Sequence, residues 1–121
     1  MTDHVAIARR YIDLWNERTP SRRREMLASD WTADARYVDP IMSGDGHDGV
    51  DALIAGVQQR FPNFKFTLIG EPNGYGDQLR FCWGLGPDGV DSPIKGTDFA
   101  LLKEGRIRSI TGFLDQVPAS A

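Results

Sequence analysis

The hydrophobic pattern changes its period once along the chain, at Phe61-Pro62, and this change constrains the fold more than any other feature. On the N-terminal side, apolar residues recur at the three- and four-residue spacing of an amphipathic helix: Val50, Leu53, Ile54, Val57 and Phe61. On the C-terminal side, apolar residues alternate as in half-buried strands: Phe64, Phe66, Leu68, Leu79, Phe81, Trp83 and Leu85. Helices followed by strands predict an α+β domain, with the helices on one face of an antiparallel sheet.

Capping residues and prolines set the expected helix boundaries. Helices are predicted over residues 2–18, 20–31 and 48–61. Thr2 is the expected N-cap of the first, and Pro20 suits the first turn of the second. Asp48 and Asp51 frame the start of the third helix like an acidic capping box.

Alternation and turn residues set the expected strands. Strands are predicted over residues 32–39, 64–68, 79–85, 94–103 and 107–115. Asn73-Gly74 predicts the turn of the first hairpin, and Glu104-Gly105 predicts the last turn. Residues 43–47 are too glycine-rich to predict a regular element.

Length, charge and cysteine content narrow the class of protein. The 121 residues are expected to form a single domain spanning 1–121, and the net charge of −3 leaves no basic footprint for nucleic acid. The run Arg22-Arg23-Arg24 is interpreted as a solvated helix face. Cys82 is the single cysteine, which excludes an internal disulfide and a CxxC motif. Without a signal peptide or a long apolar segment, the expected location is cytoplasmic, with no membrane contact.

Three acidic residues on strands and one tyrosine are candidates for a site. Asp39 shares a strand face with Ala35 and Tyr37, so it is either a strand-ending turn residue or functional. Asp98 lies mid-strand on an apolar face and needs a partner or a proton. Its candidate partners are Arg80, Arg106 and Arg108.

Tyr11 lies within the apolar stripe of the first helix. Its side chain is either a ring of the core or a hydroxyl that donates a hydrogen bond in the site. Asp115 is a third inward candidate, in phase with Thr111 and Phe113, unless it is a solvated strand end.

The strand over residues 94–103 carries apolar residues on both faces. Ile94, Ala100 and Leu102 share one face, and Phe99 and Leu101 share the other. The first face is expected to meet the helices, and the second to meet another subunit in a homodimer.

The chain resembles the SnoaL-like branch of the nuclear transport factor 2-like superfamily. The segments that carry the resemblance are Tyr11–Asn16, Tyr37–Pro40, Phe61-Pro62, Gly96–Asp98, Glu104–Ile107 and Gly112–Asp115, in the same order of elements. The resemblance implies a cone-shaped, curved sheet wrapped around three helices, with a pocket at its open end. It also implies a homodimer.

Within that superfamily, three positions are similar to those of the ketosteroid isomerases. Arg9-Arg10-Tyr11 resembles their tyrosine context, Asp39-Pro40 resembles their base, and Asp98 resembles the neutral aspartic acid that helps to bind the oxyanion, an example known from those enzymes. Gly96 stands where epoxide-hydrolase relatives carry an arginine, which argues against that activity. Polyketide-cyclase relatives place their acid late in the chain, so Asp98 and Asp115 both remain candidates for that acid.

Two functions from different classes remain open. The first is a cofactor-free isomerase or cyclase in which Asp39 takes a proton next to a carbonyl, while Tyr11 and neutral Asp98 donate hydrogen bonds to the enolate. Its expected partner is a small hydrophobic carbonyl-containing molecule, without metal or cofactor. The expected binding residues are Trp83, Phe61, Met42 and Asp115. The second is a non-catalytic binding module, favoured if Met42, Phe61 and Trp83 fill the space between Tyr11 and Asp39.

Overall fold

The computed structural model describes residues 2–118 and contains three helices and six strands. The helices are α1 (His4–Asn16), α2 (Pro20–Asp30) and α3 (Gly46–Arg60). The strands are β1 (Trp31–Val38), β2 (Ser43–Asp45), β3 (Phe64–Tyr75), β4 (Gln78–Pro87), β5 (Ile94–Lys103) and β6 (Arg106–Gln116). The predicted α+β class is therefore confirmed. Within the described part of the chain, no helix is long and apolar enough to cross a membrane.

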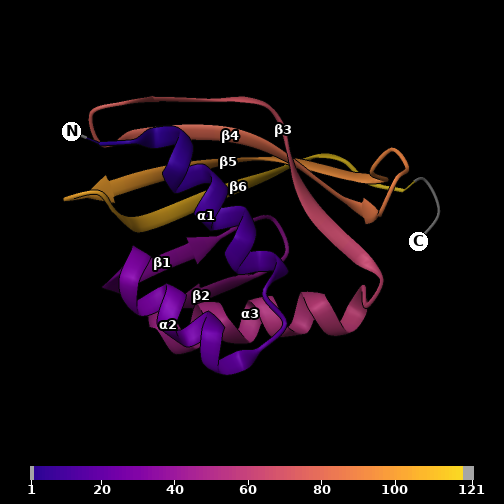
Figure 1. Cartoon of the computed structure of the whole chain (residues 1–121), viewed down its shortest axis with the longest axis horizontal. Helices are drawn as coiled ribbons and strands as arrows, with labels where there is room; N and C mark the ends of the chain where they lie inside the picture. The colour runs from indigo at the N-terminus through magenta and orange to yellow at the C-terminus, as the bar shows by residue number, and fades with distance from the viewer. Residues whose placement is uncertain (1, 119–121) are drawn as a thin grey trace.

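The strands form one curved sheet in the order β2-β1-β6-β5-β4-β3. Neighbouring strands are antiparallel except β1 and β6, which run parallel, so the sheet is mixed and not wholly antiparallel as predicted. Figure 1 shows α1 lying against the concave side, with α2 and α3 beside β1 and β2. In the same view β3 crosses from the end of α3 to the far side of the sheet and bends on the way.

The core lies between α1 and the inner face of the sheet. Tyr11 and Trp15 of α1 are buried there with the predicted alternating side chains of β4, namely Leu79, Phe81, Trp83 and Leu85. Because aromatic rings bury a large area and prefer tilted contacts, this cluster fixes the position of α1 on the sheet. Tyr11 meets Phe81 at a centroid distance of 4.9 Å, and Trp15 meets Phe66 at 5.4 Å.

Four local predictions about helix starts, a loop and a turn are wrong. Asp3, not Thr2, caps α1, because its carboxylate accepts from the amide of Ala6. Residues 43–45 form β2, because they pair with β1. Asp45, not Asp48, is the N-cap of α3, which starts at Gly46. The hairpin turn lies at Gly76-Asp77, because Asn73 and Gly74 pair with β4 after a bulge.

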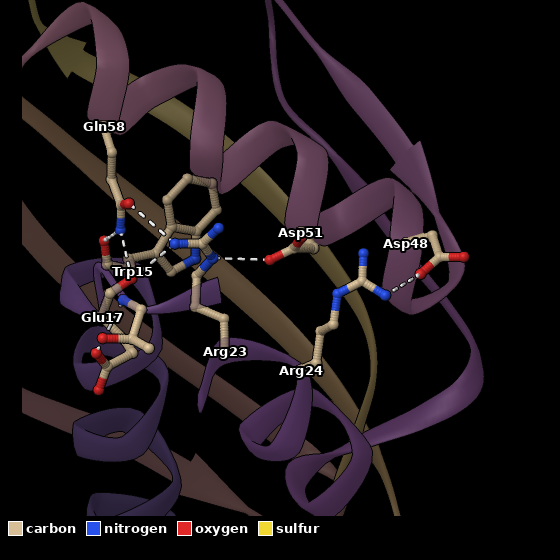
Figure 2. Close-up of polar contacts among 8 residues, drawn as sticks. Trp15, Glu17, Arg23, Arg24, Asp48, Asp51 and Gln58 are labelled. Carbon is tan, nitrogen blue, oxygen red and sulfur yellow. Dashed lines mark hydrogen bonds and ion pairs between the residues drawn. The ribbon is translucent and has the colours of Figure 1, made fainter. Parts of the chain in front are cut away.

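Arg23 is not part of a solvated face, contrary to the prediction for the arginine run. It is 3% exposed and donates from Nε to Asp51 Oδ1 at 2.7 Å, joining α2 to α3. Its Nη1 also donates to the Glu17 carbonyl and to Gln58 Oε1, as Figure 2 shows. Gln58 in turn donates to the carbonyl of Trp15 at 3.1 Å. This network therefore ties the end of α1 to both other helices.

Candidate active site

Asp98 lies at the centre of the inner sheet face and is 2% exposed. Tyr11 donates its hydroxyl to Asp98 Oδ2 at 2.6 Å, and Trp83 donates its indole N–H to Oδ1 at 3.0 Å. The partners are neutral donors, so the expected arginine partners are wrong. Arg106, for example, donates to the carbonyls of Ala28 and Trp31 instead. Each carboxyl oxygen is hydrogen-bonded, but no cation offsets the loss of hydration.

Burial raises the pKa of Asp98 to about 6. The hydrogen bonds from Tyr11 and Trp83 oppose this rise, and the nearby charges of Asp39 and Asp115 add to it. Burial and the charge of Asp98 also raise the pKa of the Tyr11 phenol well above its ordinary value. Asp98 therefore changes its protonation near pH 6, while Tyr11 stays a hydrogen-bond donor.

Asp39 is half-buried directly after β1, where the chain turns toward β2. Its Oδ1 accepts from the amides of Ile41 and Met42, both at 2.9 Å, and its Oδ2 accepts from the Tyr37 hydroxyl at 2.7 Å. The two amide bonds hold the turn, as expected of an Asp that follows a strand. The tyrosine bond fixes the orientation of the carboxyl group.

Gly112 of β6 lies between the two acids. A Cβ atom at this position would be 2.9 Å from Asp98 Oδ1, 3.1 Å from Asp39 Cβ and 3.5 Å from the Tyr37 hydroxyl. Only a residue without a side chain fits there without moving these groups. The side chains of Asp39 and Asp98 therefore lie on either side of Gly112, and Tyr11 is bonded to Asp98.

Asp115 does not join them, because of its two predicted positions the structure shows the solvated strand end and not the inward one. It is exposed on the outer sheet face and accepts from the Thr97 hydroxyl at 2.6 Å. The register of β6 against β5 shifts between Ile107 and Ser109, which is a β-bulge. Because one extra residue reverses the phase of a strand, Ile110, Gly112 and Leu114 face inward after it.

Of the expected wall residues, Trp83 bonds to Asp98 and the amide of Met42 bonds to Asp39, whereas Phe61 stacks on Phe64. Trp83 is buried, and Met42 and Phe61 are half-buried against the core. Two surface hollows of about 400 and 520 Å³ lie elsewhere, one beside Asp77 and Glu104 and the other beside Arg18 and Lys65.

Sequence reasoning missed two polar neighbours of the acids. Tyr37 was expected to face inward, but its bond to Asp39 was not foreseen. The two residues stand two apart on one strand, so their shared face was a usable signal. Trp15 lies one helical turn after Tyr11 and meets Tyr37 at a ring-centroid distance of 5.5 Å. The helical spacing places Trp15 on the correct face but does not show what its indole N–H faces.

Asp98→Asn is expected to stabilise the protein above pH 6. Since the folded pKa of Asp98 is raised from 3.8 to about 6, its contribution to stability is fully present below about pH 4 and is lost as the pH rises through about 6. The loss is on the order of 3 kcal/mol, and asparagine cannot ionise. Thermal unfolding midpoints of parent and variant should therefore diverge between pH 4 and pH 8. An effect of the substitution that is equal at both pH values would contradict this account.

Comparison with known proteins identifies relatives of this chain. A model of the SnoaL-like domain matches residues 8–110. The chain is 43% identical to a protein from Agrobacterium tumefaciens str. C58 proposed to be an isomerase of the SnoaL-like family. The match covers 95% of this chain and 99% of that one, with a TM-score of 0.89. No curated protein matches the chain.

More distant solved structures share the fold alone. A proposed ketosteroid isomerase from Kribbella flavida DSM 17836 is 20% identical over 98% of this chain and 82% of that one, with a TM-score of 0.70. A proposed SnoaL-like polyketide cyclase from Jannaschia sp. CCS1 is 15% identical over 90% and 85% of the two chains, with a TM-score of 0.68. Proteins described as nuclear transport factor 2-like also share it.

Proposed function

The chain belongs to the SnoaL-like family, and we propose that it catalyses cofactor-free proton transfer next to a carbonyl group, as an isomerase or an aldol-type cyclase. One observation carries this proposal: the side chains of two aspartates in unlike surroundings flank Gly112. Asp98 is buried and accepts hydrogen bonds only from neutral groups, whereas Asp39 is half-buried at the end of a strand. Pairs of acids whose surroundings separate their protonation are suited to acid and base roles.

Each residue has a defined task in the proposed reaction. Asp39 takes a proton from the carbon next to the carbonyl, and the electron pair of that C–H bond forms a carbon–carbon double bond as the oxygen becomes an enolate. Tyr11 and protonated Asp98 donate to this oxygen. Isomerisation ends when Asp39 returns the proton to another carbon. In a cyclase, the enolate carbon instead attacks a second carbonyl group.

The surroundings of the acids favour a small hydrophobic carbonyl-containing substrate. Apart from the carboxyl groups, the site is built from aromatic and aliphatic side chains, including Trp83, Phe66 and Met42. Within residues 2–118, no lysine or arginine forms an ion pair with Asp39 or Asp98, so a negatively charged substrate would be repelled.

A non-catalytic binding module is the second candidate, and the hydrogen bonds of Asp39 favour it. Three donors already engage this carboxylate, namely the Tyr37 hydroxyl and the amides of Ile41 and Met42. In that case the polar cluster specifies the fold and a ligand or protein partner binds elsewhere. The two candidates differ in whether a bound ketone exchanges its protons.

Deuterium exchange into cyclic enones and β-diketones tests the proposal. Exchange catalysed by the parent protein should exceed that of buffer for at least one ketone shown to bind. Because kcat/KM reports the free protein, it should fall about tenfold per pH unit above pH 6 as Asp98 loses its proton. A bound ketone that exchanges no faster than in buffer would leave the binding module as the function.

The outer sheet face is proposed to form a homodimer. Phe113 and Leu101 are 54% and 36% exposed there, with Phe99 beside them. Light scattering at micromolar concentration should therefore give the mass of a dimer. Phe113→Glu should give a monomer because it places a charge in the apolar contact, whereas Ile41→Glu, on an exposed loop, should not. A monomeric parent would contradict the proposal.

A further inference from the structure

The strand β3 lies at one border of the sheet, and a side chain of α1 occupies backbone groups on its free edge. Asn16, the last residue of α1, accepts from the Phe66 amide at 2.8 Å through Oδ1 and donates to the Phe66 carbonyl at 2.9 Å through Nδ2. A residue of a neighbouring antiparallel strand would make the same pair of bonds. The side chain of Asn16 therefore takes the place of a further strand.

The preceding outward-facing residue of this edge is covered in a similar way. Backbone groups of alternate residues point to opposite edges of a strand, so Phe64 shares the outward direction of Phe66, whereas Lys65 directs its groups toward β4. The Phe64 amide donates to the Phe61 carbonyl at 3.2 Å, and the Phe64 carbonyl accepts from Arg18 at 3.3 Å. All four outward groups of the two residues are therefore occupied by groups that belong to no strand.

The remaining parts of both sheet edges are protected by other means. Further along β3, Gly70 has a φ of +71°, the pairing with β4 is interrupted by a bulge, and Pro72 has no N–H. The opposite edge strand, β2, is only three residues long. Bulges, prolines and short strands all prevent two sheets from joining at their edges. The regular stretch from Phe64 to Ile69 is the part of the edge that depends on Asn16.

A surface hollow gives access to this stretch. It has a volume of about 520 Å³ and is lined by Asn16, Arg18, Pro62, Asn63, Phe64 and Lys65. Because Asn16 both lines the hollow and bonds to the Phe66 backbone, removing its amide would expose these backbone groups to open space. A strand edge with free N–H and C=O groups is a template for pairing with another chain.

We propose that Asn16 closes a latent interaction surface, the β3 edge from Phe64 to Ile69, whose partner is the same edge of a second copy of this chain. The pairing is antiparallel and two-fold, with Phe66 opposite its own counterpart. This register places Lys65 opposite Thr67, whereas a register centred on Lys65 would place two lysines opposite each other. The surface is separate from the outer sheet face and does not depend on the proposed reaction.

Light scattering on Asn16→Ala tests whether the edge opens. The variant should have a higher mass than the parent at equal concentration, and the difference should grow with concentration. Asn63→Ala is the matched control because it removes an exposed amide from the same hollow, and it should keep the parent mass. Asn16→Asp is a second variant, in case Asn16→Ala does not fold. It loses only the donor to the Phe66 carbonyl and should give a smaller rise in mass.

A change of charge at Thr67 tests the register. Thr67 is exposed and pairs with Gly84 of β4 within the molecule, so a charge there meets no side chain on the internal partner strand. In the Asn16→Ala background, Thr67→Glu should associate more tightly than Thr67→Lys, on the order of tenfold, because two cross-strand pairs with Lys65 change from attraction to repulsion. The difference should shrink at high salt.

Hydrogen exchange at the Phe66 amide locates the contact. In the parent this amide should be protected at every concentration because it is bonded to Asn16. In Asn16→Ala it should exchange rapidly in dilute solution and become protected as the concentration rises. If Asn16 only stabilised the fold, the Phe66 amide of the variant would exchange rapidly at all concentrations.

Three outcomes would overturn the inference. The first is equal mass of the parent and the Asn16 variants up to the highest soluble concentration. The second is association that does not respond to the charge at position 67. The third is a Phe66 amide that still exchanges rapidly in the associated variant. The proposed function is tested separately, because none of these measurements involves proton exchange on a ketone.

Discussion

Asp39→Asn should slow proton exchange on a bound ketone by about 10²–10⁴-fold, the usual effect of removing a positioned base. The amide keeps the shape of the carboxylate and can still accept from the amides of Ile41 and Met42 through its oxygen. It cannot accept a proton from carbon. The turn after β1 should therefore survive while the chemistry is lost. Exchange rates are compared at saturating ketone after unfolding midpoints confirm that the variant is folded.

Two further variants locate the effect. Asp98→Asn retains a hydrogen-bond donor next to Tyr11, so its exchange should be less impaired than that of Asp39→Asn. Asp115→Asn changes a carboxyl group on the outer sheet face and should exchange at the parent rate. Equal exchange in Asp39→Asn and the parent would rule out Asp39 as the base, and with it the catalytic proposal.

Asp51→Ala should destabilise the protein strongly, by about 3–5 kcal/mol. It leaves the Arg23 guanidinium 3% exposed without its carboxylate partner, and a buried unpaired charge is far costlier than a missing exposed ion pair. The expected fall in the unfolding midpoint is about 10–20 °C for a chain of this size. Differential scanning calorimetry measures it directly.

A neighbouring ion pair provides the matched control. Arg24 and Asp48 join the same two helices at 3.7 Å, but both side chains are well exposed (Figure 2). Asp48→Ala should therefore change the midpoint little, since exposed pairs are screened by water. The double variant Arg23→Met with Asp51→Leu removes both buried charges and should recover most of the loss. A small effect of Asp51→Ala would mean that Arg23 reaches water or another acceptor.

The spacing of apolar residues predicted the helices and strands of this fold better than it predicted which strands pair with each other. The stripe from Val50 to Phe61 and the alternation of β4 are determined by side chains within one segment, so both can be recognised locally. The strand β2 and the position of the β3–β4 turn depend on pairing with another strand, which local residue preferences do not contain. The parallel pairing of β1 with β6 is non-local for the same reason.

In the site as well, positions set by local pattern were predicted and positions set by strand pairing were not. Tyr11, Asp39 and Asp98 could be placed on inward faces because each lies in a regular stretch. Of the two positions predicted for Asp115, the inward one fails because the bulge before Ile110 reverses the phase, and nothing in the sequence around Arg108 marks that extra residue. The neutral donors of Asp98 were likewise hidden, since Trp83 was expected only as an apolar wall.

The parallel pairing of β1 with β6 also determines when during folding the two acids meet. It joins Tyr37 to Ile110, about seventy positions apart in the chain, whereas β3 to β6 are joined by hairpins. Closing so long a loop costs more chain entropy than forming a hairpin, so the sheet is expected to close after the hairpins have formed. Before closure, Gly112 has no carboxyl group from β1 beside it. The acid pair is therefore a property of the closed sheet, and no fragment of the chain holds it.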